Sequence, residues 1–198
     1  MIVLVRHGET SANVQRVLQL PDVPLSPTGC AQAERLAERV AGLGVDEILC
    51  SDLLRARMTA EPLVQRTRAK ITFTPLLQER NFGDLRGTPY AALASDPFAP
   101  GFAPPGGETW EAFYERVNAA FAEIVAHRKR TAGNLVVVTH GFVCTALVQR
   151  HVELEQGCVV PVHFFNTSIT LLDAEPPHCA RLINCRAHLD ESSDGAPA

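Results

Sequence analysis

Short apolar runs alternate along this chain with longer segments in which apolar residues recur every three or four positions. The first and fourth runs are nearly continuous Val, Leu and Ile, which is typical of strands buried on both faces. We therefore predict a single α/β domain of three α/β/α layers around a mostly parallel central sheet. The predicted strands are Ile2–Arg6, Glu47–Cys50, Ile71–Thr74, Leu135–Thr139, Ser168–Leu172 and Ala180–Cys185.

Helices are predicted between these runs. One follows Ser26-Pro27, a capping residue and a proline at the first helical position, and continues to the glycines at 42 and 44. Others begin after Asp52 and directly after His140-Gly141. The longest begins near Thr109, and its apolar stripe is best explained by packing on the sheet. That stripe contains Trp110, Phe113, Val117, Phe121 and Ile124.

Two segments do not fit this alternation. The stretch 96–107 is rich in proline and glycine and is too long for a simple connector, so we expect a lid. The end of the chain, 190–198, consists of small and acidic residues and is expected to be disordered. The domain is accordingly expected to span 1–189.

Composition narrows the function classes. The 198 residues are 46% hydrophobic and 20% charged with a net charge of −4, which argues against a general nucleic-acid binder. No apolar run approaches the ~18–20 residues of a membrane span, and the run after Met1 lacks the features of a signal peptide. We expect a cytoplasmic protein with no nucleic-acid or membrane partner. The six scattered cysteines contain no CxxC pair, which predicts reduced, mostly buried thiols.

Chemically active side chains follow three of the predicted strands. Arg6-His7-Gly8 follows the first, Thr139-His140-Gly141 follows the fourth, and Ser51-Asp52 follows the second, with Arg55 in the next helical turns. Ligands of open α/β sheets bind beyond the carboxyl ends of the strands. Two histidines and two arginines are therefore expected at one edge of the sheet.

This combination favours phosphate as a ligand. Two guanidinium groups and the amides of a helix N-terminus suit a doubly charged, oxygen-rich anion. Neutral histidine is a good phosphoryl acceptor, because one ring nitrogen stays nucleophilic while the other donates a hydrogen bond. A single His-Gly pair is more often structural, and Arg55 alone would be an ordinary surface arginine; the ordered combination favours function.

The ordered motifs resemble those of the histidine phosphatase superfamily, also called the phosphoglycerate mutase-like clan. The resemblance covers Met1 to about Leu189 and implies a phosphoglycerate mutase-like fold. The motifs are Arg6-His7-Gly8-Glu9-Thr10 with Asn13, Ser51-Asp52-Leu53-Leu54-Arg55-Ala56, Leu77-Gln78-Glu79-Arg80-Asn81-Phe82-Gly83 with Gly87, Pro105-Gly106-Gly107-Glu108-Thr109, Thr139-His140-Gly141 and Asn166-Thr167-Ser168-Ile169.

The resemblance also implies roles. His7 would be the nucleophile that becomes phosphohistidine, and Glu79 would be the general acid for the leaving alcohol and then the base for water. Phosphoryl oxygens would be held by Arg6, Asn13, Arg55, His140 and Gly141. No metal ion or cofactor is expected, because the arginines supply the positive charge.

Departures from the family pattern favour a phosphatase over a mutase. Mutases carry tyrosine where Phe82 stands, lysine where Tyr90 stands, and an arginine pair before the second histidine. We therefore predict a phosphatase acting on a small phosphorylated metabolite. A phosphoglycerate mutase is the alternative, followed by a non-catalytic phosphate-binding module and a metal-dependent hydrolase.

Two smaller departures concern neighbouring motifs. Arg86 stands where many phosphatase relatives have glutamate; we expect it to be solvated, with a second anion contact as the alternative. Met58 replaces a common glutamine and should affect packing alone. The sequence selects neither the particular substrate nor the oligomeric state.

Overall fold

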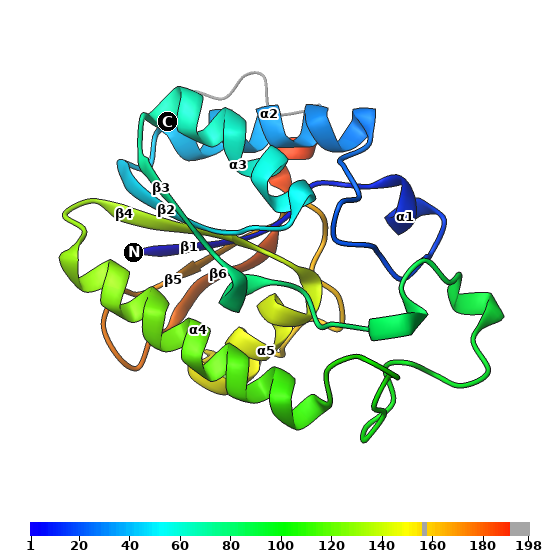
Figure 1. The fold of residues 1–198 in the computed structure, drawn as a ribbon. Helices are drawn as coiled ribbons and strands as arrows, with labels where there is room; N and C mark the ends of the chain where they lie inside the picture. Colours follow the sequence, from blue (N-terminus) through cyan, green and yellow to red (C-terminus); the bar gives the residue numbers. More distant parts are fainter. Residues whose placement is uncertain (156–157, 191–198) are drawn as a thin grey trace.

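The computed structural model describes residues 1–155 and 158–190. Their strands form one six-stranded sheet in the order β3-β2-β4-β1-β5-β6 (Figure 1). The first four run parallel, and β5 pairs antiparallel with both β1 and β6. The predicted mostly parallel α/β sheet is therefore confirmed. The strands are β1 (Ile2–Arg6), β2 (Val45–Ser51), β3 (Lys70–Thr74), β4 (Asn134–Thr139), β5 (Ile169–Leu172) and β6 (Ala180–Cys185).

Helices cover both faces of the sheet. In Figure 1, α2 (Pro27–Ala41) and α3 (Leu54–Thr67) lie above it, and α4 (Trp110–Arg130) and α5 (Gly141–His151) lie below it. Alternate residues of a strand point to opposite faces. Val3 and Val5 thus pack with α2 and α3, whereas Ile2 and Leu4 pack with α4 and α5.

The predicted strands are all present; β1 and β6 have the predicted bounds, and the others differ by one or two residues at an end. The largest difference is in β2, which begins at Val45 and extends to Ser51 instead of ending at Cys50. Short helical segments in the loops were not predicted, because they are too brief for a periodic pattern. They are α1 (Ser11–Val14), η1 (Pro75–Leu77), η2 (Gly83–Leu85), η3 (Tyr90–Ala92) and η4 (Ala187–Leu189).

Hydrogen bonds tie the predicted lid, 96–107, to the body of the domain. The Arg80 guanidinium donates to the carbonyls of Pro97 (3.1 Å) and Phe102 (2.5 Å). The indole of Trp110 donates to the Ala99 carbonyl at 2.9 Å. Opening and closing of this segment stays a prediction.

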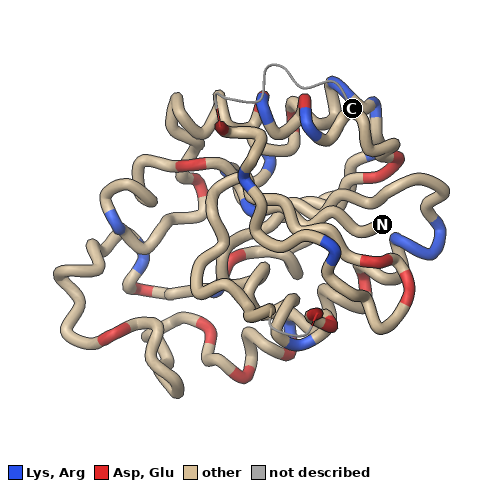
Figure 2. The backbone as a smooth tube through the Cα atoms, turned by 180° about the vertical axis from the view of Figure 1, so that it is seen from behind, with Lys and Arg blue, Asp and Glu red and all other residues tan. Residues whose placement is uncertain are grey.

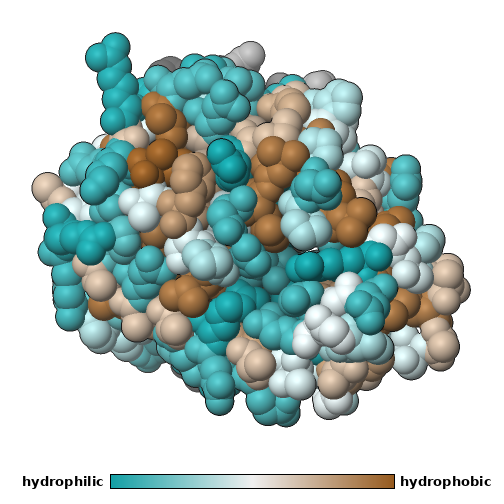
Figure 3. Space-filling model, in the orientation of Figure 1, coloured by the Kyte–Doolittle hydropathy of each residue, from teal (hydrophilic) through white to brown (hydrophobic). Residues whose placement is uncertain are grey.

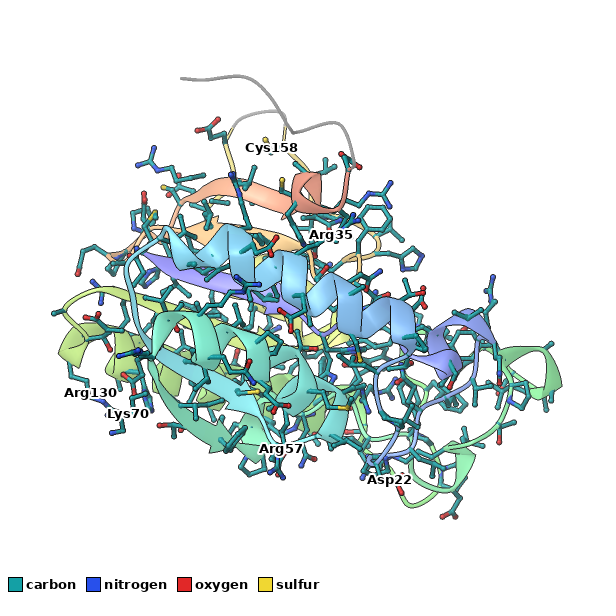
Figure 4. The ribbon with its side chains drawn as sticks, turned by 90° about the horizontal axis from the view of Figure 1, so that it is seen from above. Asp22, Arg35, Arg57, Lys70, Arg130 and Cys158 are labelled. Carbon is teal, nitrogen blue, oxygen red and sulfur yellow. The ribbon has the colours of Figure 1, made fainter. Side chains whose placement is uncertain are left out.

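The described part of the chain ends beside α2, where Arg35 donates to the Leu189 carbonyl at 2.9 Å (Figure 4). The tail predicted to be disordered lies, apart from Asp190, outside the described residues. The domain limit at residue 189 stays a prediction.

The prediction of mostly buried cysteines is wrong. The cysteines are free, but of the six only Cys50 and Cys144 are buried; Cys30 and Cys158 are exposed, and the others are partly exposed. Cys30 lies on the solvent-facing side of α2, which the apolar character of its sequence neighbours did not reveal. Exposed thiols remain compatible with the reduced state.

Charges of both signs are interspersed around the backbone (Figure 2), as expected for a small net charge. Within residues 1–155 and 158–190, no helix combines the length and the apolar character of a membrane span.

Candidate active site

Three parallel strands end side by side at one edge of the sheet. Arg6 of β1 is in register with Thr139 of β4, and the His7 amide donates to the Thr139 carbonyl at 2.9 Å. The residues directly after β1 and β4 therefore meet. The rings of His7 and His140 lie with their centroids 5.0 Å apart.

The turn after His7 is held by the helices above the sheet. The Gly8 amide donates to the Thr59 hydroxyl of α3 at 2.9 Å. The Glu9 carbonyl lies so close to Gly29 of α2 that a Cβ atom there would be 2.0 Å from its oxygen. Glycine at this position of α2 thus allows the turn that presents His7 to pack directly on the helix.

His7 is set up as a neutral imidazole. Its side chain is 2% exposed, and Nδ1 donates to the Gly8 carbonyl at 2.7 Å, since a carbonyl can only accept. Burial, and then the charges of Arg55 and Arg6, hold the pKa of His7 well below its usual range. Nε2 is left without a proton and able to act as a nucleophile.

His140 lies deeper than His7. It is fully buried at the start of α5, and Nε2 is 2.8 Å from the Ser51 hydroxyl, whereas Nδ1 has no partner among the described residues. Burial and the charge of Arg55 also hold the pKa of His140 well below its usual range. Its ring packs against the His7 ring and is not among the side chains that line the cavity.

The two predicted arginines are both drawn into this site. Arg55 is 2% exposed and donates to the Leu20 carbonyl at 3.1 Å, and burial lowers its pKa to about 10. Arg6 donates to the Phe164 carbonyl, and burial likewise lowers its pKa. The Nε atom of each guanidinium is buried without a partner among the described residues. Such groups are costly unless an anion compensates them.

Glu79 is the carboxylate of the site. Its oxygens accept from the amides of Arg80 (3.0 Å) and Phe142 (3.1 Å), and burial raises its pKa even though Arg55 and Arg6 act in the opposite direction. Gly141 lies next to it, since a Cβ atom there would be 3.7 Å from the carboxylate and 3.6 Å from Arg6 Nε.

Asn13 lies at the opening of the site, where its side-chain oxygen accepts from the Thr10 amide at 3.2 Å and from Asn166 at 3.3 Å. Asn166 also donates to the His7 carbonyl at 2.9 Å. The contacts of Asn166 and of Ser51 with the predicted site residues were not foreseen. Their motifs were recognised, but contacts between segments distant in sequence leave no local pattern.

These groups surround a cavity of about 640 Å³. Its wall includes Arg6, His7, Asn13, Arg55, Glu79 and Gly141, so six of the seven predicted site residues border one space. Phe82, Phe98 and Phe142 contribute an aromatic side. The face drawn in Figure 3 has the orientation of Figure 1 and is mixed, with hydrophilic residues between scattered apolar ones.

Contrary to the expectation from the sequence, Arg86 is not fully solvated. The side chain is partly buried and borders the cavity, because the turn after η2 folds back toward the site. Within the part of the chain that the structure describes, no cluster of His, Cys, Asp or Glu side chains is arranged for a metal ion. Independence from metal stays a prediction.

A parallel sheet whose carboxyl edge holds arginines and histidines around one cavity is suited to an anionic ligand. Comparison with known sequences identifies it more closely. Residues 2–184 match the histidine phosphatase superfamily (branch 1), and the chain belongs to this family of enzymes.

Several relatives are similar over most of their length. The chain is 31% identical to a probable phosphoglycerate mutase, GpmB, of Salmonella paratyphi B, over 87% of this chain and 84% of that one. It is 29% identical to a mycobacterial glucosyl-3-phosphoglycerate phosphatase solved with VO3, with a TM-score of 0.72, covering 85% of this chain and 88% of that one. A proposed α-ribazole-5′-phosphate phosphatase of Escherichia coli is 25% identical with a TM-score of 0.79, covering 94% and 96%. The relatives thus include both phosphatases and a mutase.

Proposed function

We propose that this enzyme is a metal-independent phosphatase that hydrolyses a phosphate monoester of a small metabolite through a phosphohistidine at His7. The observation that carries the proposal is the meeting of a neutral, buried His7 with the buried Arg55 and the partly buried Arg6 at one cavity. The guanidinium groups of Arg6 and Arg55 suit the phosphoryl oxygens, and the imidazole suits attack on phosphorus. The cytoplasmic location expected from the sequence stays a prediction.

In the first step, Nε2 of His7 forms a bond to phosphorus as the bond from phosphorus to the leaving oxygen breaks. Glu79 gives its proton to that oxygen, so an alcohol leaves. Burial raises the pKa of Glu79, so this carboxyl holds its proton to a higher pH than an exposed one, and a bound phosphate dianion raises the pKa further. Arg6, Arg55 and Asn13 border the cavity and stabilise the charge on the transferring group, and His140 packs against the His7 ring. A direct contact of His140 with the phosphoryl oxygens stays a prediction.

In the second step, water attacks the phosphohistidine. The Glu79 carboxylate takes a proton from this water, the bond between phosphorus and Nε2 breaks, and orthophosphate leaves. His7 returns to the neutral form, and Glu79 is protonated again. Each residue ends as it began, so no redox partner or second substrate besides water is needed.

The covalent step is tested by trapping the intermediate. Enzyme mixed with ³²P-labelled substrate and quenched in denaturant at alkaline pH should retain an acid-labile, base-stable phosphate, which the His7→Ala variant lacks. His163→Ala is the matched control, because His163 also borders the cavity but is exposed. Full activity in His7→Ala would overturn the mechanism.

The mutase alternative is favoured by the 31% identity to a probable phosphoglycerate mutase. Against it, Phe82 is 5% exposed and packs edge-on against Phe98, with ring centroids 5.9 Å apart. Phe82 itself therefore donates no hydrogen bond to a phosphorylated product, as a tyrosine at that position would. An assay that couples 3-phosphoglycerate to enolase distinguishes the two functions: cofactor-dependent formation of 2-phosphoglycerate faster than phosphate release would favour the mutase.

The remaining alternatives have simple tests. A non-catalytic phosphate-binding module would not turn over para-nitrophenyl phosphate, and a metal-dependent hydrolase would lose activity in EDTA. We expect turnover that EDTA leaves unchanged.

A further inference from the structure

Arg16 and Arg86, two arginines outside the proposed phosphate site, border the same cavity. Neither guanidinium makes a hydrogen bond or an ion pair within residues 1–155 and 158–190. A third arginine on the wall, Arg80, is different, because it is occupied by the carbonyls of Pro97, Phe102 and Glu108. Arg16 and Arg86 therefore present uncommitted positive charge to the cavity.

Backbone hydrogen bonds pair the two segments that carry these arginines. The Gly87 amide donates to the Leu18 carbonyl at 2.6 Å, and the Leu18 amide donates to the Thr88 carbonyl at 3.0 Å. One step along, the Tyr90 amide donates to the Arg16 carbonyl at 2.8 Å. This short antiparallel pairing, with a bridge between Val17 and Pro89, holds the two segments against each other, and both arginines border the cavity.

The two arginines differ in their exposure, since Arg16 is exposed and Arg86 is partly buried. Arg16 has a φ of 54°, which is uncommon for a residue other than glycine, and its guanidinium lies 5.8 Å from the centre of the Tyr90 ring. Arg86 is partly buried, and burial lowers its pKa. The charge acting in the opposite direction on Arg86 is that of Glu108, which is bound to Arg116 at 2.7 Å.

Arg86 is also close enough to the proposed phosphate site to influence it. After burial, the positive charges that lower the pKa of Arg55 are those of Arg86 and Arg6. Glu79 is the only carboxylate on the described cavity wall. A bound phosphate dianion therefore does not compensate all the arginine charges that border the cavity. A second anionic group on the ligand would compensate it.

We propose that Arg86, assisted by Arg16, forms a second anion subsite, and that the substrate is a phosphate monoester whose organic part carries a second anionic group, a carboxylate or a second phosphate. The inference rests on the proposed function, which assigns the transferred phosphate to the end of the cavity beside His7. Phe82, Phe98 and Phe142 line the space between the two ends with apolar surface for the carbon skeleton. Many phosphatase relatives have glutamate at the position of Arg86, so the proposed subsite depends on a residue that distinguishes this chain from them.

The test uses phosphonates, which cannot be hydrolysed, so binding is read independently of catalysis. Calorimetry compares propylphosphonate with 3-phosphonopropionate and with propane-1,3-bisphosphonate, and the corresponding five-carbon set covers a longer spacing. Wild-type protein should bind at least one ligand with a second anion about tenfold more tightly than its neutral-ended partner. Preference for the carboxylate or for the bisphosphonate identifies the second group.

Arg86→Gln should remove most of that tenfold preference, and Arg86→Lys should restore part of it. Arg57→Gln, which removes an exposed arginine elsewhere, should leave the preference unchanged. Equal affinities across both sets in the wild type, or a preference that survives in Arg86→Gln, would overturn the subsite. Turnover of para-nitrophenyl phosphate by the wild type reports on the proposed function separately.

Discussion

Burial gives the side chains of the candidate site their chemical properties. The same desolvation keeps His7 and His140 neutral, raises the pKa of Glu79 and lowers the pKa of Arg55 to about 10. A neutral nucleophile and a protonated acid are what a phosphoryl transfer needs at its start. Arg55 remains charged at neutral pH, because a pKa of about 10 is still well above it.

Two arginines on one helix give a direct test of this arrangement. Arg55→Ala should lower kcat/KM by an amount equivalent to about 2–4 kcal/mol, because it removes a buried charge from the transferring phosphoryl group. Arg57→Ala should change kcat/KM little. Arg57 is exposed, and its guanidinium lies 5.1 Å from the centre of the Phe73 ring, at the outer margin of the molecule in Figure 4. Steady-state kinetics with para-nitrophenyl phosphate provide the measurement, and equal, mild losses would mean that the site is misplaced.

The sequence predicted most of the candidate site because its residues follow buried strands or belong to ordered motifs. It could not show how deep each residue lies. His140 and His7 occupy equivalent positions after their strands, yet His7 borders the cavity and His140 lies beneath it. The position of Arg86 was missed for a similar reason, because it depends on pairing with the distant segment around Leu18.

At the scale of the elements, α2 and the turn after β1 interlock. The Ser26 hydroxyl caps α2 by accepting from the Gly29 amide at 3.0 Å and donates to the Glu9 carboxylate at 2.7 Å. The Glu9 amide donates to Gln32 at 2.9 Å. The first turns of α2 therefore position the residues that follow His7.

Gly29→Ala should disturb both stability and activity. A Cβ atom at this position would be 2.0 Å from the Glu9 carbonyl oxygen, so the helix or the turn must shift. We expect a loss of about 1–3 kcal/mol in the free energy of unfolding, from denaturant titration. Activity should fall by about tenfold or more, because small displacements of reacting groups are costly.

Gly42→Ala is the matched control in the same part of the chain. Gly42 follows α2 with a φ of −77°, and nothing lies within 4 Å of a Cβ atom there. This variant should keep the stability and the activity of the wild type. A Gly29→Ala enzyme equal to Gly42→Ala would contradict the interlocked packing of α2 on the turn.

The sequence predicted well those elements that are marked by a continuous apolar run, by a long apolar stripe or by a capping residue. Strands β1 and β4 are continuous apolar runs, and capping by Ser26 and Thr109 marks the starts of α2 and α4. The short η1, η2 and η3 were missed because three residues contain no period. Their shape comes from local backbone hydrogen bonds and from contacts with distant segments.

For the whole molecule, burial of the two histidines makes folding depend on pH. Where their pKa values are lowered in the folded state, the unfolded chain binds protons that the native state does not. Stability from these groups is then fully present above the ordinary histidine pKa of about 6.5 and is lost as pH falls below it. Glu79 acts in the opposite sense, because its raised pKa lets the native state hold a proton that the unfolded chain has released.

Because two histidines oppose one carboxyl, these three groups together make the free energy of unfolding rise with pH. Between about pH 5 and 6.5, the histidines increase stability as pH rises. Below its raised pKa, Glu79 has the opposite effect and offsets up to about half of that increase. Urea titrations at pH 5, 6 and 7.5 should therefore show the free energy of unfolding falling by about 2 kcal/mol toward pH 5.

A single substitution isolates the contribution of one histidine. His140→Gln should flatten the pH dependence by removing one proton uptake, and His7→Gln serves the same purpose if the first variant is too unstable to titrate. His163→Gln, at an exposed position, should keep the wild-type slope. The buried neutral pair is contradicted if the wild type and the substituted proteins lose stability equally between pH 7.5 and 5. If His140→Gln or His7→Gln keeps the pH dependence of the wild type, that dependence comes from other groups. Burial would then not be what keeps His7 neutral.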